Sequence, residues 1–229
     1  MAVNKVGTID DRVKVKTVLM SLFDKTGLDD LARGLVRMNP GIMLLSTGGT
    51  YSALCAALGD SAATAVRQVS DYTGQPEMQG GLVKTLDFRI YLGLLSETYN
   101  TAHAADLQRT GASAIDMVVA NLYPFGQTIA APGATLEDAR AHIDIGGPCM
   151  VRAAAKNFHR VAVLTDSSDY AGILEELEKQ NGALGLATRY RLAQKAFRLI
   201  VGYDEVIARY LESTPLAAHR GIYAIRNGD

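Results

Sequence analysis

Apolar runs of strand length alternate with segments of helical periodicity along most of this chain. Strand patterns lie at residues 13–23, 42–45, 90–95, 115–122 and 161–164. Helical spacing and capping residues predict helices at 28–38, 51–58, 135–141, 149–157, 167–180 and 186–211. This alternation favours an α/β fold with a mostly parallel open sheet flanked by helices. We expect one domain over 1–229, with the parallel core at about 13–130, a helix-rich part packed on it at about 131–211, and a tail at 212–229.

Composition and charge argue against several classes of protein. The chain has 48% hydrophobic and 21% charged residues, as soluble globular proteins do, and its net charge of -1 attracts neither nucleic acid nor anionic membranes. No apolar run reaches the ~18 residues of a membrane span, and charges near the N-terminus argue against a signal peptide. We expect a cytoplasmic protein without membrane or nucleic-acid partners. Two cysteines and four scattered histidines predict no metal site.

Two polar turns follow the first two predicted strands. Asp24 and Lys25 come after strand 13–23, and the run 46–50 (STGGT) separates strand 42–45 from the next helix. Because ligands bind at the carboxyl edge of an open parallel sheet, the two turns could share one ligand. Glycines allow close backbone approach, and the N–H groups of a helix start suit a phosphate. The alternative is an ordinary turn with a solvated lysine.

Three further clusters offer polar groups to a heterocycle. Lys84 and Thr85 lie in a polar, glycine-rich segment, and Asn121 and Tyr123 follow the strongest strand. Asp144 directly precedes a predicted helix start. An asparagine amide offers both a donor and an acceptor to the edge of a base. The structural alternatives are a surface lysine, an asparagine that ends its strand, and an N-cap aspartate.

Lys156 lies at the end of predicted helix 149–157, where a cation offsets the helix dipole without any catalytic role. Pro148 and Lys156 are eight residues apart, which is ~12 Å along a helix axis. Asp144 and Lys156 can therefore meet only if the helix bends, stops early, or a ligand spans part of the gap.

Taken in order, these clusters resemble the inosine monophosphate (IMP) cyclohydrolase domain of purine biosynthesis. That domain is usually the N-terminal half of a bifunctional enzyme whose other half is a formyltransferase. The matching stretches are 24–28 (DKTGL), 46–50 (STGGT), 69–74 (VSDYTG) with 76–78 (PEM), 83–86 (VKTL), 121–125 (NLYPF), 143–147 (IDIGG) and 152–157 (RAAAKN). With segments 188–197 and 203–204, the match extends to about residue 211. An ordered set of motifs is far more specific than any single one.

The resemblance implies a methylglyoxal-synthase-like fold, a homodimer, and no metal or organic cofactor. It implies closure of 5-formamidoimidazole-4-carboxamide ribotide (FAICAR) to IMP with loss of water. The implied substrate-binding residues are Asp24, Lys25, Thr47, Gly48, Gly49 and Thr50 toward the phosphate, and Lys84, Thr85, Asn121, Asp144 and Ile145 toward the base. Lys156 would be the catalytic proton donor or acceptor, supported by Lys84, Tyr123 and Asp144.

These residue types suit the reaction. A carboxamide nitrogen is a poor nucleophile, so Asp144 would take its proton as it attacks the formyl carbon. Lys156 would act as the acid, because the formyl oxygen gains negative charge and leaves as water. Holding both arms of one molecule together lowers the entropic cost of ring closure.

The chain departs from the family pattern at several positions. Leu82 stands where the family has an arginine that contacts the base, and Phe23 replaces a serine used at the nucleotide. Asp87-Phe88 and Tyr91 replace a His-Pro pair and a second histidine, and Leu199-Ile200 replace a common His-Thr pair. Replacing an arginine by leucine removes a charged, bidentate contact, so base recognition is expected to differ.

Two other functions suit the implied fold. A regulatory module would bind a phosphorylated effector without catalysis, but it has no need of Asp144 and Lys156 together. A phosphate-eliminating lyase such as methylglyoxal synthase is disfavoured because it lacks the clusters at 121–125 and 143–147. Residues 212–229 are too few for a formyltransferase domain, so we expect a separate formyltransferase to supply the substrate.

Overall fold

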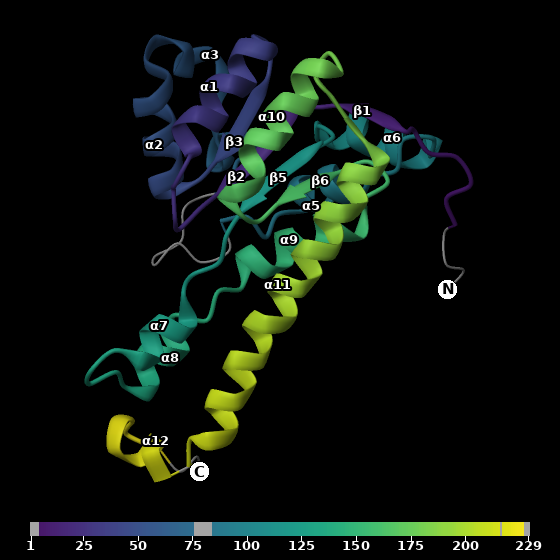
Figure 1. Cartoon of the computed structure of the whole chain (residues 1–229). Coiled ribbons are helices and arrows are strands. Elements are labelled where there is room, and N and C mark those ends of the chain that lie inside the picture. The colour runs from purple at the N-terminus through teal and green to yellow at the C-terminus, as the bar shows by residue number, and fades with distance from the viewer. Residues whose placement is uncertain (1–4, 76–83, 216, 227–229) are drawn as a thin grey trace.

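A computed structural model of the chain describes residues 5–75, 84–215 and 217–226 (Figure 1). Its centre is a sheet in the order β4-β3-β2-β5-β6, in which every neighbouring pair is parallel. These strands are β2 (Thr17–Ser21), β3 (Met43–Ser46), β4 (Val66–Gln68), β5 (Met117–Ala120) and β6 (Ala162–Leu164). A separate antiparallel pair joins β1 (Arg12–Lys14) to β7 (Ala183–Gly185). The predicted parallel α/β sheet is confirmed.

Helices cover both faces of this sheet. On one face α1 (Leu28–Met38) packs against α2 (Gly48–Leu58) and α10 (Tyr170–Lys179). On the other face α5 (Phe88–Leu95) packs against α9 (Gly146–Lys156). The chain crosses into β5 and β6 in the opposite direction along the sheet from its crossings into β3 and β4. Because such crossovers are right-handed, their helices lie on opposite faces. The long helix α11 (Leu186–Ser213) lies along α9 and β6. The remaining helices are α3 (Ala62–Ala65), α4 (Val69–Thr73), α6 (Thr101–Thr110), α7 (Phe125–Ala130), α8 (Leu136–Ala141) and α12 (Ala217–Ile222).

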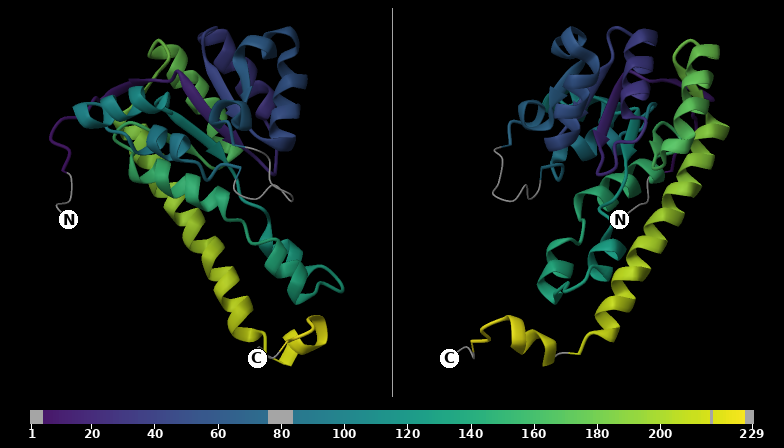
Figure 2. Two further views of the ribbon diagram at one scale, coloured as in Figure 1. Left: turned by 180° about the vertical axis from the view of Figure 1, so that it is seen from behind. Right: turned by 60° about the vertical axis from the view of Figure 1, so that its left-hand side comes forward.

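A helical arm extends beyond the carboxyl edge of the sheet, as Figures 1 and 2 show from three sides. The arm consists of α7, α8, α12 and the second half of α11, and α7 contacts both α8 and α11. The ring of Phe125, at the start of α7, is buried against Tyr203 and Tyr210 of α11. The long helix therefore joins the arm to the core.

The strands β2, β5 and β6 are buried on both faces, which explains their continuous apolar sequence. Val18, Leu19 and Met20 of β2 and Val118 and Val119 of β5 are all fully buried. Burying a side chain of this kind is worth about 1.5–3 kcal/mol relative to leaving it in water. This core fixes the strand ends that carry the candidate site.

The structure corrects the prediction of a strand at 90–95. These residues lie in α5, where the Asp87 carboxylate accepts a hydrogen bond from the N–H of Arg89 at 2.7 Å and caps the helix. Ile90, Gly93 and Leu94 share the buried side of that helix. A short apolar run fits either element, and the cap and this helical spacing favour the helix.

Other differences concern boundaries. Residues 13–23 divide between β1 and β2, and the predicted turn region at 69–78 contains α4 in its described part. The sheet is not confined to the first 130 residues, because β6 comes from the helix-rich part. Helix α1 and the capping box of Thr135 and Asp138 before α8 are as predicted. No helix in the described ranges has the length and apolarity needed to cross a membrane.

Candidate active site

A cavity of about 640 Å³ lies at the carboxyl edge of the sheet, beyond the ends of β2, β3 and β5. Its lining comes from residues 21–23, 25, 47–50, 84–86, 121, 123, 141–147 and 150. Among the predicted site residues, those that line it are Lys25, Thr47, Gly48, Gly49, Thr50, Lys84, Thr85, Asn121, Tyr123, Asp144 and Ile145. The fold therefore brings together five segments that are far apart in the sequence.

The start of α2 forms the end of the cavity that is predicted to hold a phosphate. Gly48 has a φ of 51°, in the left-handed region that favours glycine. No side chain of the described residues caps this helix, so the N–H groups of its first turn can meet an anion. The Lys25 ammonium lies 3.8 Å from where a Cβ would stand at residue 49, and it donates to the Phe23 carbonyl at 3.2 Å.

Thr50 has a structural role in this turn. Its buried hydroxyl accepts a hydrogen bond from the N–H of Leu22 at 2.9 Å and donates to the carbonyl of Leu22 at 3.0 Å. Ser46 makes a similar link, donating to the carbonyl of Met20 at 2.8 Å. These hydroxyls fix the end of β2 against the β3–α2 turn. Because the Thr50 hydroxyl already bonds to the backbone of Leu22, Thr50 can offer a ligand its backbone N–H rather than its hydroxyl.

Asn121 also uses its side chain within the protein. Its Oδ1 atom accepts hydrogen bonds from the N–H groups of Phe23 at 2.7 Å and Asp24 at 3.2 Å. Its Nδ2 atom donates to the Asp24 carbonyl at 2.7 Å. The amide thus joins the loop after β5 to the turn that carries Lys25.

The Asp144 carboxylate lies over the start of α9. Its Oδ1 atom accepts from the N–H of Gly147 at 2.9 Å, and its Oδ2 atom accepts a long hydrogen bond of 3.5 Å from the N–H of Tyr123. A Cβ at residue 147 would lie 2.5 Å from Oδ2 and 2.8 Å from Cδ2 of Leu122. Only glycine allows this approach, so the second glycine of the IDIGG motif is required for the position of the carboxylate.

The wall beside Asp144 is apolar and partly aromatic. The rings of Phe23 and Tyr123 lie 5.5 Å apart in an edge-to-face arrangement, and each residue is about half exposed. Ile145 is 58% exposed at the same cavity. Thr85 is buried, and its Oγ1 atom would lie 2.9 Å from a Cβ at residue 146. The lining of the cavity therefore combines the cationic side chains of Lys25 and Lys84 with an apolar, partly aromatic wall.

Two predicted site residues lie outside this lining. Asp24 is exposed, and its carboxylate accepts from the N–H and the hydroxyl of Thr26 at 2.9 and 2.7 Å, which lowers the pKa of Asp24. Lys156 is exposed at the end of α9, a single helix that begins at Gly146. Ten residues of helix span about 15 Å, so Lys156 does not reach Asp144 of the same chain.

The other family departures lie in different settings. Asp87 caps α5, and Tyr91 of that helix is partly buried, which raises the pKa of Tyr91. Leu82 and Gly80-Gly81 lie outside the described residues. Leu199 and Ile200 lie within α11.

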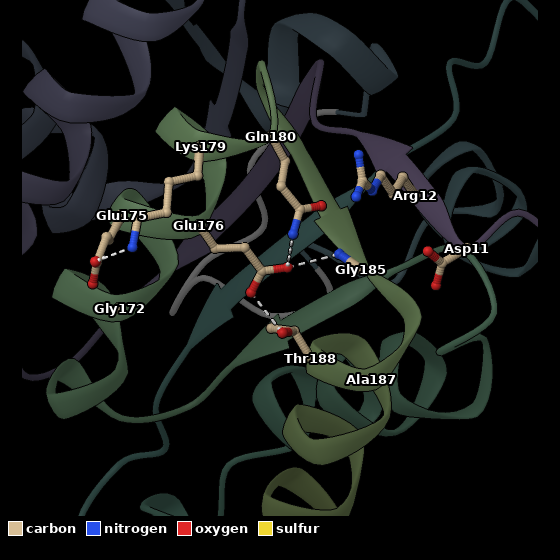
Figure 3. Close-up of a pocket in the computed structure, with 10 residues that line it drawn as sticks. All are labelled: Asp11, Arg12, Gly172, Glu175, Glu176, Lys179, Gln180, Gly185, Ala187 and Thr188. Carbon is tan, nitrogen blue, oxygen red and sulfur yellow. Dashed lines mark hydrogen bonds and ion pairs between the residues drawn. The ribbon is translucent and has the colours of Figure 1, made fainter.

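A second hollow of about 470 Å³ lies near the start of α11, away from the carboxyl edge (Figure 3). Several of the polar groups that line it form hydrogen bonds or ion pairs with one another. The Glu176 carboxylate accepts from the N–H of Gly185 at 2.8 Å and the hydroxyl of Thr188 at 2.6 Å, and Lys179 pairs with Glu175. These contacts tie α10 to the β7–α11 junction, which is a structural role. Among the described residues, no group of three or more His, Cys, Asp or Glu could hold a metal ion.

The fold and the cavity agree with the comparisons to known proteins. The family model of the MGS-like domain matches residues 27–149, and the chain belongs to that family. The model of the AICARFT/IMPCHase bienzyme matches residues 154–226. The resemblance inferred from the ordered motifs is therefore confirmed.

Relatives of the chain include bifunctional purine biosynthesis proteins. The bifunctional purine biosynthesis protein PurH of Neisseria gonorrhoeae (strain NCCP11945) is 47% identical over 199 residues, which are 87% of this chain and 36% of that protein. PurH of Chlorobium chlorochromatii (strain CaD3) is 46% identical over 204 residues, 89% of this chain and 38% of that protein. The crystal structure of ForH matches with a TM-score of 0.71 at 33% identity, covering 86% of this chain and 99% of ForH. This chain thus spans little more than a third of the length of these PurH relatives.

Proposed function

We propose that the chain is an IMP cyclohydrolase that closes FAICAR to IMP. The observation that carries this proposal is the cavity itself. One part of its lining offers Lys25 and the first turn of α2 to a phosphate, another offers Asp144 beside an apolar wall, and Lys84 also lines the cavity. A ribotide has the same division, with a dianionic phosphate at one end and a planar heterocycle at the other. The kinship with PurH supports this assignment.

In the proposed reaction, Asp144 takes a proton from the carboxamide nitrogen as that nitrogen attacks the formyl carbon. Lys84 lies at the cavity and stabilises the negative charge that develops on the formyl oxygen. After this oxygen is protonated, the hydroxyl leaves with the remaining formamido proton, which forms the ring C=N bond and releases one water. The phosphate contacts hold the ribotide in the cavity, so that its two arms stay beside Asp144 during closure.

The proton donor or acceptor role that the resemblance implies for Lys156 calls for a second copy of the chain. Within one chain, α9 separates Lys156 from Asp144 by its whole length. We propose a homodimer in which Lys156 of one copy serves the cavity of the other. Mixing an Asp144→Asn chain with a Lys156→Ala chain then restores activity, because one site of each hybrid carries both native residues. If the mixture stays as inactive as its parents, this arrangement is wrong.

Two variants test ligand binding and catalysis separately. Lys25→Met should weaken binding of both IMP and ribose 5-phosphate by about tenfold or more, since it removes a charge-assisted contact. Asp144→Asn should keep phosphate binding and lower kcat by about a hundredfold or more. Lys179→Met, a change at a surface ion pair, is the matched control for Lys25→Met. A chain that binds IMP but converts no FAICAR would instead be a nucleotide-binding regulatory module.

We also propose that the protein works in the cytoplasm, without a nucleic-acid partner. Its substrate carries a formyl group on an aminoimidazole nitrogen, so a formyl-transfer reaction must supply it. We propose that a formyltransferase does so.

A further inference from the structure

Tyr203 of α11 contacts the loop that carries Asp144. Its hydroxyl oxygen accepts a hydrogen bond of 2.7 Å from the backbone N–H of Asp144. The two residues are 59 positions apart in the sequence. Tyr203 is partly buried, so its hydroxyl is held between the long helix and the loop between α8 and α9.

The same side chain also contacts the loop that carries Asn121 and Tyr123. The ring of Tyr203 lies 6.5 Å from the ring of Phe125, which is 1% exposed. The N–H of Phe125 donates to the carbonyl of Tyr123 at 2.8 Å. Tyr203 is thus linked to both sides of the cavity wall, by a hydrogen bond to one loop and by ring packing to the other.

The contact between these two loops is weak on its own. The hydrogen bond from the N–H of Tyr123 to the Asp144 carboxylate is 3.5 Å long. The shorter hydrogen bond to the carboxylate, at 2.9 Å, comes from the N–H of Gly147, which lies in the same segment as Asp144. A side chain that holds both loops from outside can fix the position of Asp144 against Tyr123 where direct contact does not.

We propose that Tyr203 is a positioning residue, which holds the Asp144 carboxylate in the place needed for ring closure. This inference rests on the proposed function, and it gives α11 and the helical arm a part in the reaction. Tyr203 lines no part of the cavity, so it acts through Asp144 rather than on the substrate. Displacing a catalytic group by about 1 Å can cost about a hundredfold in rate.

The test compares Tyr203→Phe with Tyr210→Phe. Tyr203→Phe keeps the ring against Phe125 and removes only the acceptor for the Asp144 N–H. Tyr210 lies on the same helix and packs on the same Phe125 ring, at 5.8 Å, and is the matched control. We expect Tyr203→Phe to lower kcat roughly tenfold to a hundredfold, with little change in KM or melting temperature. Tyr210→Phe should match the native chain.

A second readout does not depend on activity. Hydrogen exchange of peptides covering residues 142–147 should be several-fold faster in Tyr203→Phe than in the native chain, with peptides from the sheet unchanged. Native kcat and native exchange in Tyr203→Phe would overturn the proposal. A fall in kcat accompanied by an equal rise in KM and a lower melting temperature would also overturn it, because the role would then be structural. If the native chain does not convert FAICAR, the proposed function fails, and the exchange measurement still tests the link to Asp144.

Discussion

The amide of Asn121 accepts a hydrogen bond from the N–H of Phe23 at 2.7 Å and thereby holds the turn that carries Lys25. It makes two more bonds to the backbone of Asp24. The residue implied to contact the base thus has its side chain committed to the turn that carries Lys25. A substitution at Asn121 can therefore distinguish support of the turn that carries Lys25 from contact with the base.

Asn121→Ala should weaken binding of ribose 5-phosphate and of IMP by the same factor, because the turn with Lys25 loses its support. Titration calorimetry with both ligands checks this. If Asn121 bound the base, ribose 5-phosphate would bind the variant as well as it binds the native chain, and only IMP would bind less tightly.

Gly147→Ala should lower activity at least tenfold and destabilise the fold by about 1–3 kcal/mol, because the new methyl group collides with the Asp144 carboxylate and Leu122. Gly172→Ala, in the exposed face of α10, meets nothing within 4 Å and is the control. It should be neutral or stabilising by up to about 1 kcal/mol. Denaturant unfolding of the two variants measures the difference, and equal stability would contradict the collision, because the first turn of α9 would then have relaxed around the new methyl group.

Phe23→Ser restores the residue typical of the family. Because Phe23 packs edge to face with Tyr123 at the cavity wall, the change should weaken IMP binding by about twofold to tenfold. Phe88→Ser, at an equally exposed ring that does not line the cavity, should leave binding unchanged. Tighter binding of IMP to Phe23→Ser would mean that the aromatic wall suits a different heterocycle.

The pair of Asp166 and Lys195 predicts a pH effect. Lys195 lies 2.7 Å from the Asp166 carboxylate, and this contact and the N–H of Ser168 lower the pKa of Asp166 to about 2. Since the folded pKa is depressed, the pair stabilises the fold above pH about 4 and loses its effect as pH falls toward about 2. Both side chains are partly exposed, so solvent screening keeps this contribution below about 1 kcal/mol.

A carbon-detected NMR titration of the carboxylates measures this directly. Lys195→Met should raise the pKa of Asp166 toward the ordinary value of about 3.9. Lys179→Met, which breaks the pair with Glu175 instead, should leave Asp166 unchanged. An unchanged titration of Asp166 in Lys195→Met would contradict the assignment.

Local sequence signals predicted the parts of the fold that depend on neighbouring residues. Helix α1 has a clear apolar face and begins after Gly27 in the left-handed region, so its bounds could be predicted. The apolar run of α5 could not be assigned from its composition, because burial on one face of a helix and in a strand look alike over eight residues.

In the candidate site, too, some features could be predicted from the sequence and others depend on the tertiary fold. The turns with Lys25 and Gly48 could be placed together because β2 and β3 are adjacent and parallel. The links from Asn121 to Phe23 and from Tyr203 to Asp144 could not, because they join loops that only the tertiary fold brings into contact. For Lys156, the helix length already indicated a gap, which the unbroken α9 bears out within one chain.

The most direct test of the proposed function is an ultraviolet assay of the purified chain with FAICAR, following appearance of the hypoxanthine ring. We predict turnover without added metal or formyl donor, and its loss in Asp144→Asn. Tight binding of IMP with no ring closure above the rate in buffer alone would contradict the proposed function.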